Sequence, residues 1–430
     1  MNSSKFQLAF TGVFAAFIII GMIFFAFGGK GSSVAQSPVL VWGAMPEQTF
    51  KQVFSQSPLS KSEIIKVTYV QKFSKTYDAE LLEALASGLG PDLVFMPQDT
   101  LWKNNNKIYT IPFENYSERN FRDTFAEGGE IFMSSTGLLA IPFSVDPLVM
   151  YWNRDIFTNA SMSTPPAYWD EFFTLSQALT VKDGSFNIIR ATAPLGEFQN
   201  INNAKEIIST LMMQAGTPIV SYSNNSYRSV IMEKGNAEVL PSEAAVTFFT
   251  EFSNPAKPFY TWNRSLPSSQ SMFLSGDLSI YFGFASEAKS LKFKNPNLNF
   301  DVAPFPQSRT GSRKITFGKM TGLAILKNSK SVAASYAVAV DLTSLPMQIE
   351  FLKSLNEPSA RRDLLVRPGT DVFTPTFNSS ALYAKAWIEP NNTITDTLFQ
   401  NLIESITSGR ERVTVSLSLL SLELDNLFPR

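Results

Sequence analysis

Residues 39–96 have the sequence VLVWGAMPEQTFKQVFSQSPLSKSEIIKVTYVQKFSKTYDAELLEALASGLGPDLVFM, in which strand-like and helix-like patterns alternate. Three short apolar stretches predict strands, and the two stretches between them carry apolar residues at helical spacing. Such alternation is typical of a parallel sheet with crossover helices, so we expect an α/β fold. In chain order the expected elements are a strand at 39–42, a helix at 47–56, a strand at 65–69, a helix at 78–87 and a strand at 93–96.

The same alternation continues along the rest of the chain. Residues 169–180 carry apolar side chains at helical spacing, and residues 278–282 and 322–326 are expected to form strands. The stretch 413–419 alternates with a period of two, as a strand does, yet the leucines from 417 onward also stand at helical spacing. The pattern alone leaves both assignments open there.

Composition excludes several classes of function. The chain has 430 residues, 44% of them hydrophobic, which is enough for one large or two medium-sized domains. Lys plus Arg is 36 and Asp plus Glu is 37, so no excess of positive charge favours a nucleic-acid partner. Without any Cys or His there is no disulfide, no thiolate or imidazole metal site and no Ser-His-Asp triad. We therefore expect no metal and no cofactor.

The N-terminus predicts a membrane anchor. Leu8 to Phe27 is a run of 20 residues without a charge, and a helix of that length spans about 30 Å, the thickness of a bilayer's hydrocarbon core. The alternative is a signal peptide cleaved after Ala35, although its apolar stretch would be unusually long. A Gly/Ser-rich linker follows the run, so residues 1–37 are expected to be anchor and linker, with the bulk of the chain extracytoplasmic at the cell membrane.

Five segments, taken together and in order, resemble the family 1 extracellular solute-binding proteins, the maltose-binding-like receptors of ABC importers. The likeness spans nearly the whole chain after the linker. The segments are Gly90–Phe95 with Asp99, Ala140–Asp146 leading into Met150–Phe157, Pro165-Pro166 with Trp169–Phe172, Met272–Asp277 leading into Ile280–Gly283, and Phe317-Gly318 leading into Gly322–Ile325.

The resemblance implies a two-lobed periplasmic-binding-protein type II fold that closes on a ligand between its lobes. Lobe 1 would hold residues 38–143 and 320–367, and lobe 2 would hold residues 144–319 and 368–430. The likeness also favours a helix for the ambiguous C-terminal stretch. The implied function is solute capture, without catalysis, for an ABC permease that has separate ATPase subunits. This chain itself has no G-x-x-x-x-G-K-[ST] loop for ATP.

The expected ligand is a mono- or oligosaccharide, and the candidate contacts follow from its chemistry. Sugar hydroxyls need carboxylates and amides, while the flat C–H faces of a sugar need aromatic rings. In parallel sheets these groups should stand beyond strand ends and at the crossings between lobes. The candidates for the hydroxyls are Glu47, Asp99, Ser144, Asp146, Glu197 and Asn200, and those for stacking are Trp42, Phe284 and Trp387.

Each candidate has a structural alternative. Asp99 could be a solvated loop acid, and Asp146 could bond only to backbone at a crossing. Glu197 and Asn200 precede a predicted helix, so helix capping competes with binding. Trp42 ends a strand and could simply belong to the core. Where many members of the family carry an aromatic residue three positions before the acid at 99, this chain has Met96.

Three alternatives compete with the receptor of an importer. Ser286 and Lys289 form the S-x-x-K spacing of Ser-Lys acyl-transfer enzymes, although no Lys-Thr-Gly follows. Two of Asp99, Asp146 and Glu197 could instead serve a carboxylate-dependent glycosidase, if they stood about 5–9.5 Å apart. A surface receptor or adhesion module of the same fold, without transport, is the third alternative. The sequence does not identify the ligand, the permease or the oligomeric state.

Overall fold

The computed structural model describes residues 36–223, 226–311, 313–369 and 371–428. The predicted membrane anchor, Leu8 to Phe27, lies outside the described residues. Within them no single helix combines the length and the apolar composition that a membrane span requires. Helices α12 (Val332–Leu342) and α13 (Leu345–Leu352) meet both criteria only as a pair, which is bent by 60°.

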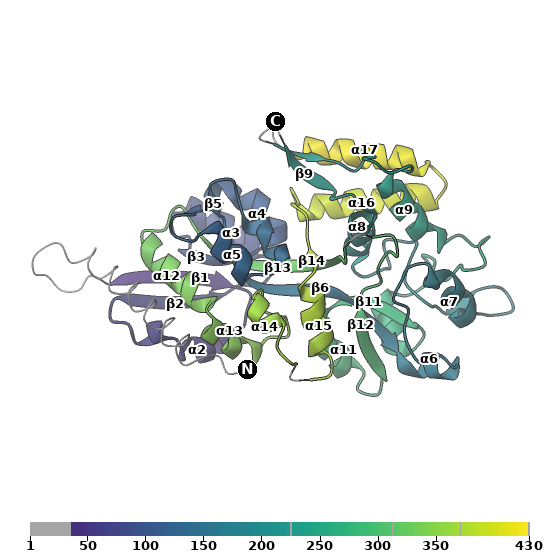
Figure 1. Ribbon diagram of the computed structural model, residues 1–430, viewed down its shortest axis with the longest axis horizontal. Helices are drawn as coiled ribbons and strands as arrows, with labels where there is room; N and C mark the ends of the chain where they lie inside the picture. Colours follow the sequence, from purple (N-terminus) through teal and green to yellow (C-terminus); the bar gives the residue numbers. More distant parts are fainter. Residues whose placement is uncertain (1–35, 224–225, 312, 370, 429–430) are drawn as a thin grey trace, which may run out of the picture.

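A mixed eight-stranded sheet runs through the molecule (Figure 1). Six strands lie in the order β2-β1-β3-β13-β6-β11, while β12 pairs with β6 and β14 pairs with β13. β1 is parallel to both β2 and β3, which confirms the parallel arrangement predicted for residues 39–96. β13 is antiparallel to β3 and to β6. The strands are β1 Ser37–Gly43, β2 Ile65–Gln71, β3 Leu93–Pro97, β6 Ile141–Asn153, β11 Ile280–Phe284, β12 Phe300–Pro304, β13 Thr316–Ile325 and β14 Ala384–Lys385.

The two crossover helices form where the apolar spacing predicts them. In α2 (Glu47–Phe54) the buried side chains are Phe50 and Val53, three residues apart on one face. Helix α3 (Tyr77–Ala86) buries Tyr77 and Leu81 in the same way and ends just before Gly88, whose φ is +72°. Each helix therefore packs one apolar face and leaves the other face to solvent.

The described residues form two hydrophobic cores, which the strands β6 and β13 connect. The buried residues of the first core lie between Val39 and Val145 and between Met320 and Leu365, and they include Ala381 and Ala384. The buried residues of the second core lie between Leu148 and Phe317 and, apart from Ala381 and Ala384, between Phe377 and Phe428. In β6 the core changes between Val145 and Leu148, and in β13 it changes between Phe317 and Met320. Both strands thus pass from one core to the other, and Figure 1 shows them in the middle of the molecule.

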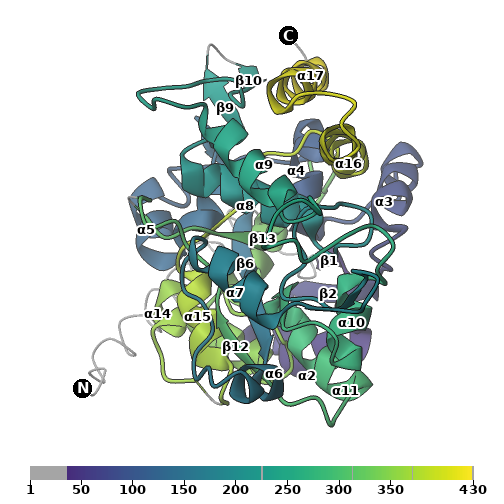
Figure 2. The same ribbon diagram turned by 90° about the vertical axis from the view of Figure 1, so that its right-hand side faces the viewer.

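Four helices pack together on one side of the second core, as Figure 2 shows for α8, α9, α16 and α17. They are α8 (Ala204–Ala215), α9 (Pro241–Glu251), α16 (Asn392–Thr407) and α17 (Val413–Asn426). The ambiguous C-terminal stretch is therefore a helix, because Leu417, Leu420 and Leu424 are all buried on one face of α17. Packing against α16 buries the leucines at helical spacing. The apolar residues that belong only to the period of two expected of a strand stay partly exposed.

The other elements are short and connect those above. The predicted helix at 169–180 is α7 (Glu171–Leu179), and the strand expected at 278–282 is displaced to β11. The remaining helices are α4 Gln98–Asn104, α5 Glu118–Thr124, α6 Arg154–Asn159, α10 Ser269–Ser275, α11 Ala288–Lys294, α14 Arg362–Leu365 and α15 Thr374–Ala381, with 3₁₀ turns η1 Pro58–Lys61, η2 Asn105–Lys107, η3 Glu127–Phe132 and η4 Ala285–Glu287. Three two-stranded sheets pair β4 Ile111–Pro112 with β5 Gly137–Leu138, β7 Val181–Lys182 with β8 Ile188–Arg190, and β9 Val220–Ser223 with β10 Ser226–Ser229.

Candidate ligand-binding cleft

A cavity of 640 Å³ lies between the two cores. One wall is formed by residues that follow β1 and β3, at the carboxyl ends of these parallel strands. The opposite wall is formed by Ser286 in η4 and by residues 391–393 at the start of α16, and the segment 354–357 closes one end. The cavity therefore lies where the parallel strands predict a ligand site.

Asp99 stands in the first turn of α4 and lines this cavity. Its Oδ2 accepts a hydrogen bond of 3.0 Å from Nδ2 of Asn392, which comes from the opposite wall. Its Oδ1 is buried and has no hydrogen-bond partner in the described part of the chain. Burial raises the pKa of Asp99, an effect that Lys205 and Lys319 partly offset. One oxygen of this carboxylate is thus buried without a partner, while the residue itself lines the cavity.

Behind Asn392 lies a buried ion pair. Nζ of Lys205 is 2.9 Å from Oε2 of Glu389, and both side chains are only 2% exposed. Thr395 donates a further hydrogen bond of 2.9 Å to the same carboxylate oxygen. Burial raises the pKa of Glu389 to about 7 in spite of the lysine. Lys205 also donates to Oδ1 of Asn392, so the ion pair is connected to Asp99 through one amide.

Two further carboxyl groups lie where β6 passes between the cores. Oγ of Ser144 donates a hydrogen bond of 2.8 Å to Glu357, and both residues line the cavity. Asp146 is buried next to them and accepts a bond of 2.9 Å from the backbone N–H of Ser286. Burial, followed by repulsion from Glu357, raises the pKa of Asp146 to about 7. Burial also raises the pKa of Glu357.

Lys319 is the cation nearest to these acids. It stands on β13 directly opposite Asp146 on β6, and its Nζ lies 3.9 Å from the centre of the Phe284 ring. Its positive charge partly offsets the rise that burial causes in the pKa values of Asp99, Asp146 and Glu357. No sequence motif marks this lysine as a site residue. Its place on a predicted crossing between lobes was the available signal.

The buried acids predict how stability depends on pH. The pKa of Asp146 is about 7 in the folded protein and near 3.8 in the unfolded chain, so the folded state binds more protons between these values. Stability should therefore fall as the pH rises from about 4 to about 7. Urea denaturation at several pH values should show that Asp146→Asn removes part of this loss and adds about 1–3 kcal/mol at pH 8.

The exposed Asp123 on α5 supplies the control for this experiment, since its side chain is 72% exposed. Asp123→Asn should leave the pH profile unchanged. If Asp146→Asn and the wild type had the same dependence of stability on pH, the assignment of a raised pKa to Asp146 would be wrong.

A second, smaller hollow of 360 Å³ continues along α16. Asn392 and Thr393 line the large cavity, while Asp396 and Gln400 line the smaller one, one and two turns further along the same helix. Gln199 and Glu206 form part of its other side. Both spaces thus border the same helix, and the residues of α16 that line them were not among the sequence candidates.

The structure brings three of the nine sequence candidates together: Asp99 and Ser144 line the cavity, and Asp146 lies beside it. The aromatic candidates lie outside the lining. Trp42 is packed in the first core, with Nζ of Lys72 at 3.8 Å from its ring. Phe284 is 2% exposed beneath Lys319. The rings that do line the cavity are Tyr77, Phe95 and Phe143.

Trp387 belongs to a different place. It is buried, its Nε1 donates 3.2 Å to Oγ of Ser209, and it lines a separate cavity of 610 Å³ between η3 and α8. Trp387 was proposed as a stacking residue for a sugar. It is instead part of the second core, because the centre of its indole ring lies 6.1 Å from that of the Phe399 ring.

The three polar candidates outside the lining have local partners. Glu47 pairs with Lys51 at 2.5 Å on the exposed face of α2. Glu197 bonds to Arg264 at 3.2 Å. Asn200 bridges backbone carbonyls and accepts from Trp262, which fixes a turn, while residue 203 holds the N-cap position of α8. These side chains are used within one side of the molecule.

The two residues of the S-x-x-K spacing interact with different partners. Ser286 lines the cavity, but its backbone N–H is bonded to Asp146. The charge of Lys289 acts on Asp371, whose pKa it helps to lower. Within the described residues no group of three or more acidic side chains is arranged to hold a metal ion.

Comparison with known proteins supports a family assignment. The sequence profile of a family described as bacterial extracellular solute-binding proteins matches residues 58–367. A binding protein of Brucella abortus is 23% identical over 269 residues, which are 59% of this chain and 60% of that protein. A binding protein of Brucella suis matches to the same extent. The chain thus spans about 60% of the length of the curated relatives that it matches.

Solved structures share the fold over almost the whole chain. A cyclo/maltodextrin-binding protein complexed with maltotetraose has a TM-score of 0.74 and 16% identity, covering 92% of this chain and 98% of that chain. The cyclic α-maltosyl-1,6-maltose binding protein of Arthrobacter globiformis has a TM-score of 0.75 and 13% identity, with coverages of 91% and 99%. The match of the family profile to most of the sequence carries the assignment: the chain belongs to the bacterial extracellular solute-binding proteins.

Proposed function

We propose that this chain is the extracytoplasmic receptor of an ABC-type importer and that it captures a saccharide. The observation that carries the proposal is the cavity of 640 Å³, which is lined by the carboxyl groups of Asp99 and Glu357 together with amides and hydroxyls. A cavity of this volume falls within the range of small-molecule sites, about 300–1,000 Å³. Its lining joins acids, amides and hydroxyls to three aromatic rings, which suits a ligand with hydroxyls and flat C–H faces.

The two hydrophobic cores are the centres of two lobes in this proposal. Lobe 1 comprises residues 38–143 and 320–367, and lobe 2 comprises residues 144–319 and 368–430. Support comes from β6 and β13, in each of which the core changes within three residues. Strands that pass between cores can bend as a hinge, and a ligand held by both walls then favours the closed form.

An oligosaccharide suits the site better than a single sugar. The cavity of 640 Å³ and the hollow of 360 Å³ both border α16, so a longer ligand would find further polar side chains along this helix. Several proteins of the same fold were solved with oligosaccharides, among them maltotetraose and mannotriose. Those two proteins are 16% identical to this chain, so their ligands suggest a probe set for it.

Transport requires partners that this chain does not supply. The proposed partners are a membrane permease and separate ATPase subunits, because no phosphate-binding loop for ATP occurs in the sequence. The uncharged run from Leu8 to Phe27 is proposed to anchor the receptor at the outer side of the membrane. These proposals rest on the family and on the composition of the run.

A thermal-shift screen tests the function. Ligand that binds only the folded state stabilises the protein by about 2.7 kcal/mol at a hundredfold excess over Kd, so Tm should rise by several degrees. The purified chain should respond to one or more members of a panel of malto- and manno-oligosaccharides, and titration calorimetry should give one ligand per chain. A rise with a peptide or a polyamine, and with no saccharide, would overturn the proposed ligand class.

A further inference from the structure

Helix α4 contacts the opposite lobe at two points one turn apart. Asp99 accepts the hydrogen bond from Asn392 of α16. Trp102 packs edge-on against Tyr227 and Phe428, with ring centres 5.0 and 5.4 Å away. Both aromatic partners pack in the second core. Helix α4 of the first lobe can therefore keep these contacts only while the two lobes are close together.

Lys205 determines which way the amide of Asn392 faces. An ammonium group can only donate hydrogen bonds, so it requires the carbonyl oxygen of the amide, Oδ1. The NH₂ group must then point away from Lys205, and it does so toward Asp99. With the amide reversed, an NH₂ group would face an ammonium group and the carbonyl would face a carboxylate. Both contacts would be repulsive.

Glu389 and α16 keep Lys205 in place. Glu389 binds Nζ at 2.9 Å, and Thr395, one turn into α16 from Asn392, donates to the same carboxylate. Burying this ion pair costs free energy, because both charges must be desolvated, and an apolar pair in the same place is often as stable. A positional role gives a reason for these charges at this place.

We infer that Lys205 is a positioning residue of the cleft, which through Glu389 and Asn392 holds the lobes together at Asp99 and fixes the carboxylate of Asp99 in the wall of the cavity that the ligand would occupy. This inference rests on the proposed function for its second half only. The first half, the effect on the separation of the lobes, concerns the protein without ligand and is measured separately.

The test uses variants that leave no lone charge in the core. Lys205→Met with Glu389→Gln removes both charges and keeps the volumes, and Asn392→Ala breaks the relay beyond the ion pair at an exposed position. The matched control is Lys257→Met with Glu251→Gln, a partly exposed pair of the same length, 2.9 Å, away from the cleft. Circular dichroism should show that all the variants are folded.

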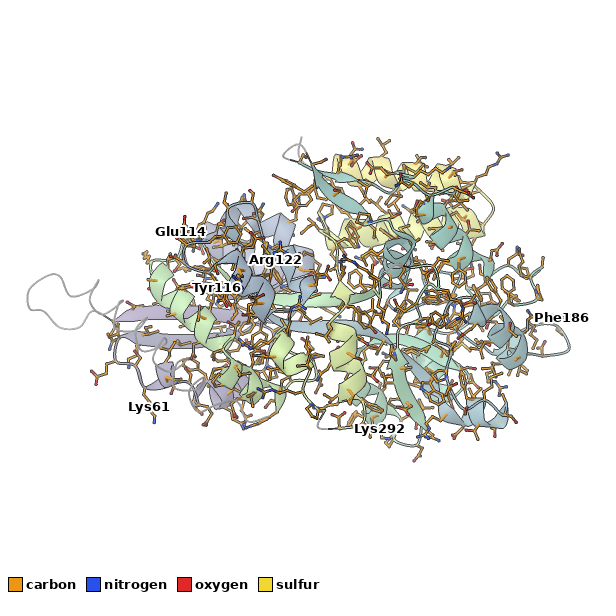
Figure 3. All side chains as sticks on the ribbon, in the orientation of Figure 1. Lys61, Glu114, Tyr116, Arg122, Phe186 and Lys292 are labelled. Atoms are coloured by element: carbon orange, nitrogen blue, oxygen red, sulfur yellow. The ribbon has the colours of Figure 1, made fainter. Side chains whose placement is uncertain are left out.

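Lobe separation is measured by double electron–electron resonance between two introduced cysteines. The chain has no natural cysteine, so Lys61→Cys and Lys292→Cys give unique labels. Both lysines are exposed, one on each proposed lobe, and Figure 3 shows them at the edge of the molecule. In the absence of ligand, the double variant and Asn392→Ala should both shift the distances to longer values, and the control pair should not.

The combination of variants identifies the route of the effect. Adding Asn392→Ala to the Lys205/Glu389 variant should produce little further shift, because both changes break the same relay. Affinity for maltotetraose, used as the probe, should fall roughly tenfold in each. Additive shifts would overturn the inference, as would unchanged distances in Asn392→Ala, even if the ion-pair variant failed to fold. If maltotetraose never binds, only the proposed ligand fails, and the ligand-free distances still decide the role of Lys205.

Discussion

Lys205→Met alone should lower the free energy of unfolding by about 3–5 kcal/mol, because it leaves the carboxylate of Glu389 buried without its partner. Both side chains of the pair are 2% exposed, so solvent cannot replace the lysine. Urea denaturation followed by circular dichroism measures the change. The variant should also take up a proton near neutral pH, since the pKa of Glu389 is about 7 even with the lysine present.

The double variant Lys205→Met with Glu389→Gln is the control for this result. It removes the stranded charge and should restore most of the lost stability, while Lys257→Met at the partly exposed pair with Glu251 should cost less than about 1 kcal/mol. If Lys205→Met were as stable as the wild type, the pair would not be buried in solution as it is in the structure.

Asp99→Ala should weaken saccharide binding by about a hundredfold, the largest effect expected of any single change in the cleft. The substitution removes the free Oδ1 and the hydrogen bond of 3.0 Å from Asn392. One hydrogen bond between a sugar hydroxyl and this carboxylate would contribute up to about 3 kcal/mol, which is about two factors of ten in affinity. Titration calorimetry with the best saccharide of the thermal-shift screen measures the loss.

The fold should tolerate this change. The pKa of Asp99 is raised by burial, so the folded protein holds the ionised carboxylate at a cost, and its removal should leave Tm unchanged or higher. Glu47→Ala provides the comparison, since Glu47 pairs with Lys51 on the exposed face of α2 and should change affinity less than twofold. Equal losses from the two substitutions would show that the ligand lies closer to α2 than the cavity indicates.

Periodicity predicted most of the fold because apolar spacing is a local property. The strands and helices between residues 39 and 96 form at the predicted places, and the parallel pairing of β1 with β2 and β3 follows from their connections. The C-terminal stretch could not be decided in this way, since its pattern fits two periods. Packing of Leu417 and Leu420 against the second core selected the helix.

The site was less accessible to sequence reasoning. Asp99 was proposed because it follows a predicted strand, and Ser144 and Asp146 because the family resemblance implies a crossing there; all three lie in or beside the cavity. Trp42 and Trp387 were proposed as stacking residues because an aromatic near a strand end or in a loop can face either solvent or core. Their burial follows from contacts with residues far away in the chain, among them Ser209 for Trp387.

The sequence by itself determined the α/β class, the order of the first five elements and the exclusion of cysteine and histidine chemistry, because these depend on residue type and on neighbours within a few turns. Only the tertiary structure decided that Lys205, Glu389 and Asn392 form one relay to Asp99. Lys205 is 184 residues from Glu389, and Asn392 is 293 residues from Asp99. Contacts over such separations arise only when distant parts of the chain pack together in the fold, and no local pattern records them.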